Sequence, residues 1–482
     1  MSEQAIIELI NRGPVHLIGI KGTGMSALAE LLVGRGIPVS GSDTTEEFYT
    51  DRILKEMDIP FREGFSGDGI PGETSLVVHS AAYTPENNAE CAAAAARGIP
   101  LISYPRALGL FSRGSRFAGI AGIHGKTTTA AMAGTMLRET ELPASVLVGS
   151  AVPAFGGRST SSRGRDYFIA ETCEYRRHFL NFRPAWIVVT NIEEDHLDYY
   201  TGAADVMDAF TEYAMLLEEN GELIYCADDP GAVELAGRAG KARPDIRLIP
   251  YGFEARGPYR IVSAGTSSGI TSFSLLKAGD FEIRVPGRHM VLDAAGALAL
   301  CSRLMEDSPW TAGGRYLDAF RKGLGNYTGC RRRSEIVGEA AGVLFIDDYG
   351  HHPTEIISTL AGYREFYPGR RIIVDFMSHT YSRTEKLLEG FAGAFRSADM
   401  VILHRIYASA REKMGEVDGR RLYAEVGRHH GKVVYFDEVM DAEDYCIETL
   451  KEGDVFITMG AGNNWVLGRA LFERFSRKGR AV

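Results

Sequence analysis

A glycine-rich turn that ends in Lys126 and Thr127 carries the residues best suited to chemistry. The apolar run 117–121 predicts a buried strand before this turn, and residues 127–139 predict a helix after it. At such a helix start, backbone N–H groups and the helix dipole hold phosphate oxygens. The lysine reaches the β/γ end and the threonine hydroxyl ligates Mg²⁺. The glycine spacing differs from that of the common P-loop, so a structural turn with a surface lysine is the alternative. We interpret the turn as an ATP site.

Carboxylates and a histidine follow the next two predicted strands of this region. Glu171 and Glu174 lie at and after the end of the strand 167–171, and His196 follows the strand that ends at Asn191. The carboxyl ends of parallel strands border the crevice where phosphates bind. Glu174 and His196 are therefore candidates to complete Mg²⁺ coordination, directly or through water. A surface turn is the alternative for His196.

A second glycine turn, Gly22-x-Gly24-x-x-Ala27, follows a strand-like run near the start of the chain. A further strand, 39–43, ends on Asp43. This fingerprint predicts a diphosphate at the helix N-terminus and a ribose near Asp43. Lys21 is expected to add positive charge near that diphosphate. The alternative is a structural turn without a ligand.

In the last third of the chain, strands again end on polar residues. The run 343–348 is followed by Tyr349 and His352, and the run 371–376 is followed by His379 and Arg383. Residues 331–333 are three arginines, which we expect to bind an anionic ligand at a domain junction. The alternation of strands and helices predicts a doubly wound α/β domain.

The elements that must position these residues predict three α/β domains. We expect domain ranges of 1–112, 113–327 and 328–482 in a chain of 482 residues. Residues 258–285 predict antiparallel strands that pair at the edge of the central sheet, and 156–165 predict a mobile loop.

The composition excludes several classes of function. A net charge of −10 argues against bulk binding of nucleic acid or anionic membranes. The six cysteines are scattered without a C-x-x-C pair, and neither a leader nor a long apolar run is found. We therefore expect a reduced, soluble, cytoplasmic protein, as a monomer or homodimer.

Six blocks together resemble the Mur ligases over essentially the whole chain. The most specific are His-Gly-Lys-Thr-Thr-Thr and Asp-Asp-Tyr-Gly-His-His-Pro. The blocks occupy residues 19–26, 122–129, 171–175, 190–200, 347–355 and 379–384. Some Mur ligases resemble one another in a carbamylated lysine after the second block. This chain has no lysine between Lys126 and Lys241, and it is more similar to the members that add the first amino acid.

The resemblance implies an ATP-dependent ligase of peptidoglycan precursor synthesis. Such an enzyme joins L-alanine to the lactyl carboxylate of UDP-N-acetylmuramate through an acyl phosphate, and releases ADP and phosphate. It also implies two Mg²⁺ ions and three domains. An N-terminal Rossmann-like domain holds the UDP-sugar and a central P-loop ATPase-like domain holds ATP. A C-terminal Rossmann-like domain brings the amino acid and closes the site.

The resemblance also implies roles for particular residues. Catalytic roles fall to Lys126, Glu174, His196, His352 and Arg383. ATP binding is implied for Gly122, His124, Gly125, Lys126, Thr127, Thr128, Asn191 and His289. UDP-sugar binding is implied for Gly22, Thr23, Gly24, Met25, Ser42, Asp43, Ser80 and His124. Amino-acid binding is implied for Tyr349, His352 and Arg383, and metal binding for Thr127, Glu174 and His196.

One stretch departs from the family pattern. Where the family places two asparagines that contact adenine, this chain has Met290 and Asp293. Neither side chain offers the paired donor and acceptor of an amide, which puts strict adenine preference in doubt. Two alternatives follow. One is the murein-tripeptide ligase of cell-wall recycling, which usually has a bulky residue where this chain has Gly24. The other is a nucleotide-binding paralogue without activity.

Overall fold

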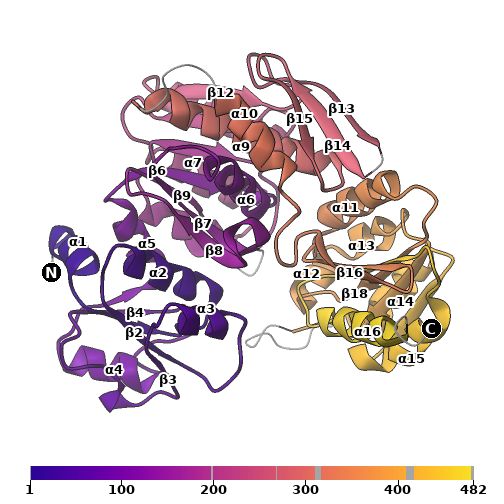
Figure 1. Ribbon diagram of the computed structural model, residues 1–482, viewed down its shortest axis with the longest axis horizontal. Coiled ribbons are helices and arrows are strands. Elements are labelled where there is room, and N and C mark those ends of the chain that lie inside the picture. Colours follow the sequence, from indigo (N-terminus) through magenta and orange to yellow (C-terminus); the bar gives the residue numbers. More distant parts are fainter. Residues whose placement is uncertain (1, 197–198, 268, 310–315, 409–416, 479–482) are drawn as a thin grey trace. The chain divides into compact units, whose positions relative to one another are not determined.

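The computed structural model describes residues 2–196, 199–267, 269–309, 316–408 and 417–478 (Figure 1). These described residues form four sheets of five, seven, three and six strands. The chain divides into two compact units. The first comprises residues 1–192, 207–250 and 296–320, and the second comprises 193–206, 251–295 and 321–482. Within the described ranges, no helix combines the length and the apolar character that crossing a membrane would require.

The N-terminal sheet has the order β3-β2-β1-β4-β5, and its pairs are parallel. Every residue of β1 is buried, as expected for a strand with helices on both faces. The strands are β1 (Val15–Ile18), β2 (Val39–Asp43), β3 (Phe61–Glu63), β4 (Leu76–His79) and β5 (Leu101–Ser103). The helices are α1 (Glu3–Arg12), α2 (Thr23–Gly34), α3 (Thr50–Glu56), α4 (Ala89–Ala96) and α5 (Tyr104–Ser112).

The central sheet has the order β12-β11-β10-β6-β9-β7-β8, so β6 lies in the middle. Its strands are β6 (Arg116–Ala121), β7 (Ala144–Val152), β8 (Arg158–Ser162), β9 (Tyr167–Glu171), β10 (Trp186–Val189), β11 (Glu222–Cys226) and β12 (Arg247–Tyr251). The helices that follow these strands are α6 (Lys126–Leu137), α7 (Ala203–Ala214), α8 (Pro230–Ala242), α9 (Arg288–Asp307) and α10 (Tyr316–Gly325). The predicted strand–turn–helix around Lys126 is confirmed, because β6 ends at Ala121 and α6 begins at Lys126.

Two sequence-based predictions for the central region are wrong. The stretch 156–165 is not a loop, since it contains β8, whose residues Ser159–Ser161 are buried and which pairs antiparallel with β7. Its short polar side chains hide this strand from a periodicity argument. The stretch 258–285 does not extend the central sheet. It forms a separate antiparallel sheet of β13 (Ile261–Ser267), β14 (Ile270–Leu275) and β15 (Gly279–Ile283), because these strands satisfy one another locally.

The C-terminal sheet has the order β16-β17-β21-β18-β19-β20. Its strands are β16 (Glu335–Ala340), β17 (Val343–Asp348), β18 (Ile372–Phe376), β19 (Met400–His404), β20 (Val433–Phe436) and β21 (Val455–Met459). Its helices are α11 (Pro353–Phe366), α12 (Tyr381–Lys386), α13 (Leu388–Ala394), α14 (Gly419–Gly427), α15 (Glu443–Thr449) and α16 (Trp465–Lys478).

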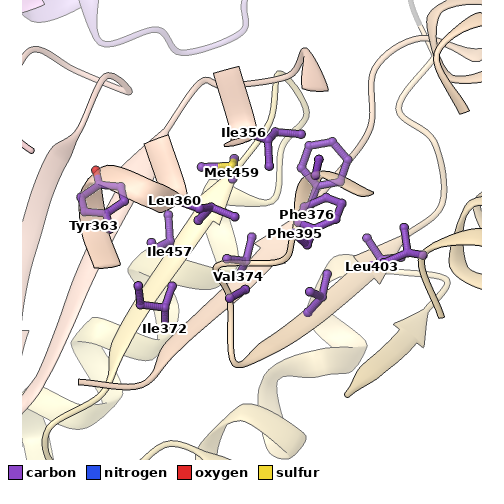
Figure 2. Close-up of a cluster of buried hydrophobic side chains, with 14 of the residues drawn as sticks. Ile356, Leu360, Tyr363, Ile372, Val374, Phe376, Phe395, Leu403, Ile457 and Met459 are labelled. Carbon is purple, nitrogen blue, oxygen red and sulfur yellow. The ribbon is translucent and has the colours of Figure 1, made fainter. Parts of the chain in front are cut away.

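Alternate residues of the C-terminal strands enter two separate apolar cores. One core joins Val374 and Phe376 of β18 to Ile356 and Leu360 of α11, as Figure 2 shows. The other joins Ile373 of the same strand to residues of α15 and α16. Helices therefore cover both faces of this sheet, as predicted for a doubly wound domain.

Candidate active site

Three neighbouring parallel strands bring the phosphate-site residues together. β10, β6 and β9 lie side by side in the central sheet. At their carboxyl ends lie the glycine turn after β6, Glu171 and Glu174 of β9 and the following loop, and Asn191 after β10. The glycine turn, Glu171, Glu174 and Asn191 therefore share one edge of this sheet, within the first unit.

The glycines of the turn are required by its geometry. Gly122 has φ of +141° and Gly125 has φ of +81°, both in the region that favours glycine. A Cβ atom at Gly122 would overlap the hydroxyl of Thr190. That hydroxyl donates a hydrogen bond to the carbonyl of His124. The turn is thus closed against the end of β10, and a side chain at Gly122 would open it.

Asn191 holds the same turn from β10. Its Oδ1 accepts hydrogen bonds from the N–H groups of Ile123 at 3.1 Å and His124 at 2.9 Å. Its Nδ2 donates to the His124 carbonyl at 3.1 Å. All three contacts shape the turn, so Asn191 acts on a phosphate-binding site through the backbone that it fixes. Thr190, which sequence reasoning missed as a site residue, has the same action.

Two carboxylates lie at the start of α6. Lys126 Nζ lies 2.9 Å from Glu174 Oε2 and donates to the Ile123 carbonyl at 3.0 Å. Burial disfavours the charged amine, but the combined effects of Glu174, Cys173 and Glu171 outweigh burial, and the pKa of Lys126 lies above its ordinary value. The Thr127 hydroxyl donates to Glu171 Oε2 at 2.7 Å.

Glu171 is therefore a site residue that the sequence analysis did not assign. A Cβ atom at Gly149 of β7 would overlap the Glu171 carboxylate, so this glycine makes room for it. The position of Glu171 at the end of β9 was the signal in the sequence that could have identified it. The left-handed glycine before α6, the lysine, the hydroxyl and two carboxylates fit a nucleotide triphosphate with a divalent cation.

The second glycine turn begins α2 in the N-terminal sheet. Gly22 is the N-cap residue of α2. The predicted Thr23 accepts a hydrogen bond from the Tyr49 hydroxyl at 3.2 Å, and Met25 is buried. A Cβ atom at Gly24 would lie 2.8 Å from the ring of Tyr104. This contact explains the glycine at that position.

The strand ends beside this turn are tied into the fold. Asp43 accepts hydrogen bonds from the N–H groups of Lys21 at 2.6 Å and Thr44 at 2.8 Å. The Ser42 hydroxyl donates to the buried Glu90, and the Ser80 N–H donates to a carbonyl of β1 at 3.0 Å. In this structure, Ser42 and Asp43 therefore bond to the protein itself, and these contacts help to fix the shape of the turn.

The expectation for Lys21 is wrong. Its side chain is fully buried, and Nζ lies 2.9 Å from Glu63 and 3.2 Å from Asp51. It also donates to the Glu46 carbonyl at 3.0 Å. The charge is paired inside the domain, because two acids distant in sequence converge on it.

The remaining predicted residues lie in the second unit. Arg383 Nη2 lies 3.0 Å from Asp195 Oδ1, and Arg383 Nη1 donates to the His379 carbonyl at 2.7 Å. Burial opposes ionisation of Asp195, but the guanidinium holds the pKa of that carboxyl well below its usual range. His196 follows with φ of +54°, and its N–H donates to Asp195. Asp195 was missed by the sequence analysis. Leu197 and Asp198, in the same sequence block, lie outside the described residues.

Two histidines and a tyrosine surround the start of α11. His352 is the N-cap residue of this helix in a capping box with Glu355. His351 lies beside the Tyr349 ring at a centroid distance of 5.2 Å. Burial lowers the pKa of His351 to about 3, against the opposing charge of Glu355. Burial likewise lowers the pKa of His289 to about 4, so both rings are neutral at physiological pH.

The arginines before β16 are paired within the C-terminal domain. Arg332 Nε lies 3.3 Å from Asp347, and Arg333 Nη1 lies 3.2 Å from Glu355. Both guanidinium groups lie about 5 Å from the Tyr349 ring centroid. These contacts hold Tyr349 in place and engage the charges that we expected to bind an anion.

The two departures from the family pattern are both buried. Met290 is 4% exposed and Asp293 is 7% exposed. Both lie near the start of α9, on the face that packs into the protein.

Comparisons with known proteins agree over nearly the whole chain. Family models described as the Mur ligase family catalytic domain, the Mur ligase middle domain and the Mur ligase glutamate ligase domain match residues 14–116, 120–301 and 332–462. A UDP-N-acetylmuramate–L-alanine ligase of Treponema pallidum is 51% identical over 96% of this chain and 97% of its own length. The Desulfitobacterium hafniense protein of the same name is 37% identical over 95% of this chain and 99% of its own.

A solved structure agrees in fold. The UDP-N-acetylmuramate–alanine ligase of Thermotoga maritima superimposes with a TM-score of 0.77 and 24% identity, covering 97% of this chain and 100% of that one. A murein peptide ligase of Psychrobacter arcticus superimposes with a TM-score of 0.66 and 19% identity, covering 96% and 99%. The three domain matches, the curated relatives and the phosphate-site geometry agree, and the chain belongs to the Mur ligase family.

Proposed function

We propose that this protein joins L-alanine to the lactyl carboxylate of UDP-N-acetylmuramate and converts ATP to ADP and phosphate. The observation that carries the proposal is the pairing of Lys126 with Glu174 and of Thr127 with Glu171 at the glycine turn. This set suits phosphoryl transfer, and the relatives with 51% and 37% identity carry the name of that ligase. We place the reaction in the cytoplasm, by a monomer or homodimer.

In the first step, a lactyl carboxylate oxygen attacks the γ-phosphorus and the bond to the β-phosphate oxygen breaks, which gives an acyl phosphate and ADP. Lys126 stabilises the negative charge of the transferring group. Thr127, Glu171 and Glu174 would hold Mg²⁺, which neutralises phosphate charge when bound. We assign a second Mg²⁺ to His196. Asn191 and Thr190 keep the glycine turn in the geometry that the phosphates need.

In the second step, the alanine amine attacks the acyl carbon, phosphate leaves and the amine loses a proton. We assign Arg383 to the acyl phosphate or the alanine carboxylate, with Asp195 fixing its planar fork. His352 and Tyr349 are assigned to the amino acid. His352 is held by the capping box of α11, and Tyr349, in the loop after β17, is held by cation–π contact with Arg333.

A murein-tripeptide ligase is the second candidate. The solved murein peptide ligase shares the fold at 19% identity, which carries no substrate assignment. That class usually has a bulky residue at the position of Gly24. In this chain any side chain at Gly24 would meet Tyr104, so the turn is built differently.

The test is phosphate release with UDP-N-acetylmuramate, Mg²⁺ and a panel of acceptors, comprising L-alanine, glycine, L-serine and the tripeptide. Release that requires both the UDP-sugar and L-alanine is the expected result. Release with the tripeptide alone would overturn the alanine assignment. Binding of UDP-N-acetylmuramate and ATP without release of phosphate would favour a paralogue without activity. Repeating the assay with GTP in place of ATP measures how strictly this protein selects adenine with Met290 and Asp293 in place of the family's two asparagines.

A further inference from the structure

Tyr104 lies beside the glycine turn at the start of α2, in the first unit. It begins α5, and its ring lies against Gly24 at the start of α2. A Cβ atom at Gly24 would meet both the ring carbon Cζ and the hydroxyl oxygen at 2.8 Å. The hydroxyl end of Tyr104 therefore lies directly over the N-terminus of the helix at which a diphosphate is expected.

The negative charge of Glu171, at the end of β9, also acts on this side chain. Partial burial, Glu171 and Cys173 all raise the pKa of Tyr104 above its ordinary value. Glu171 accepts the Thr127 hydroxyl at the phosphate turn. With its pKa raised, the phenol remains protonated and able to donate at every physiological pH.

The Tyr104 hydroxyl has no hydrogen-bond partner within the part of the chain that the structure describes. Tyr104 is only partly buried as a residue. A tyrosine that served packing alone would not require its hydroxyl at this point. A donor at a phosphate-type turn suits a ligand that carries anionic oxygens.

We propose that Tyr104 is a substrate-binding residue that donates a hydrogen bond from its hydroxyl to the diphosphate-sugar portion of UDP-N-acetylmuramate. This inference rests on the proposed function. The ring fixes the path of the substrate over Gly24, and the hydroxyl orients the portion of the substrate that leads from the α2 turn toward Glu171. Tyr104 then contributes to positioning the lactyl carboxylate without taking part in proton or phosphoryl transfer.

Tyr104→Phe tests the proposal, because it removes the hydroxyl and keeps the ring over Gly24. Because the variant loses one hydrogen bond to a charged group, Kd and KM for the UDP-sugar should increase about tenfold. KM values for ATP and L-alanine should change less than twofold. Because the hydroxyl has no protein partner, Tm should stay unchanged.

Tyr167→Phe is the matched control. Its hydroxyl donates to Asp307 at 2.9 Å on another part of the same unit. Tyr167→Phe should lower Tm and leave KM for the UDP-sugar unchanged, whereas Tyr104→Phe should raise this KM and leave Tm unchanged.

Direct binding of UDP-N-acetylmuramate, measured by calorimetry without ATP, supplies a readout other than turnover. An unchanged Kd and KM in Tyr104→Phe would overturn the assignment, and so would an increase confined to KM for ATP. Wild-type protein that releases no phosphate in response to the UDP-sugar would instead refute the proposed function. The two failures are therefore distinguishable.

Discussion

Replacing Glu30 with glutamine should stabilise this protein above neutral pH. Glu30 lies on α2 and is 4% exposed. Its Oε2 accepts from the Thr160 hydroxyl at 3.1 Å and lies 3.6 Å from Arg158, both on β8. Its Oε1 has no hydrogen-bond partner among the residues that the structure describes. Burial raises the pKa of Glu30 to about 7, against the opposing effects of Thr160 and Arg158.

The sign and size of the effect follow from that pKa. A carboxyl whose pKa is raised in the folded state contributes stability that is present below about pH 4.5 and is lost as the pH rises to about 7. At about 1.4 kcal/mol per pH unit, the ionised side chain costs about 3 kcal/mol above pH 7. Glutamine keeps an acceptor for Thr160 and carries no charge. Glu30→Gln should therefore gain least near pH 5 and exceed the wild-type Tm by about 3 °C at pH 8.

The assay is the difference in Tm between variant and wild type at pH 5, 6, 7 and 8. Glu56→Gln is the control, because Glu56 lies 3.6 Å from the same arginine but its side chain is 43% exposed. It should show no pH-dependent gain. If Glu30→Gln lowers Tm equally at pH 5 and pH 8, the reasoning is wrong and Glu30 is a stabilising, ionised partner of Arg158.

Four further outcomes test the site. Lys126→Ala should reduce kcat by about 10²-fold in the phosphate-release assay, since transition-state charge stabilisation is lost; unchanged turnover would remove Lys126 from the ATP site. Gly122→Ala should reduce kcat by about 10²-fold, because the added methyl overlaps the Thr190 hydroxyl; a fully active variant would show that the turn tolerates opening. Arg383→Ala should raise KM for L-alanine or reduce kcat, and steady-state kinetics with both parameters unchanged would make its pairing with Asp195 structural. Among the six cysteines, all described, only Cys173 is exposed. Because of this exposure, maleimide should label Cys173 first, and earlier labelling of any other cysteine in peptide mapping would contradict this. Desolvation and Glu174 raise the pKa of Cys173 to about 12, so the rate should rise about tenfold per pH unit from 7 to 9.

The sequence by itself determined the local units and the family. Apolar runs that end in glycine turns predicted β6 with α6 and β1 with α2, because strand burial and helix starts depend on neighbouring residues. The six blocks were sufficient for the Mur ligase assignment, since each combines a strand end with rare residue types.

Only the tertiary structure decided which groups pair. Lys21 is neutralised by Asp51 and Glu63, so a charge that the sequence placed near a ligand lies inside the fold. Thr127 binds Glu171, and Lys126 binds Glu174, although both acids follow the same strand. Such choices depend on side chains that meet across elements far apart in sequence, and no local pattern encodes them.

The same reason explains the two wrong predictions for strands. Whether a polar segment such as β8 is a strand, or whether β13–β15 join an existing sheet, depends on which backbone edges are available after folding. Residue types and spacing specify the chemistry that the site can perform. The partners that fix the charge, orientation and protonation of each group are set by packing, because burial and distance act between residues that only the fold brings together.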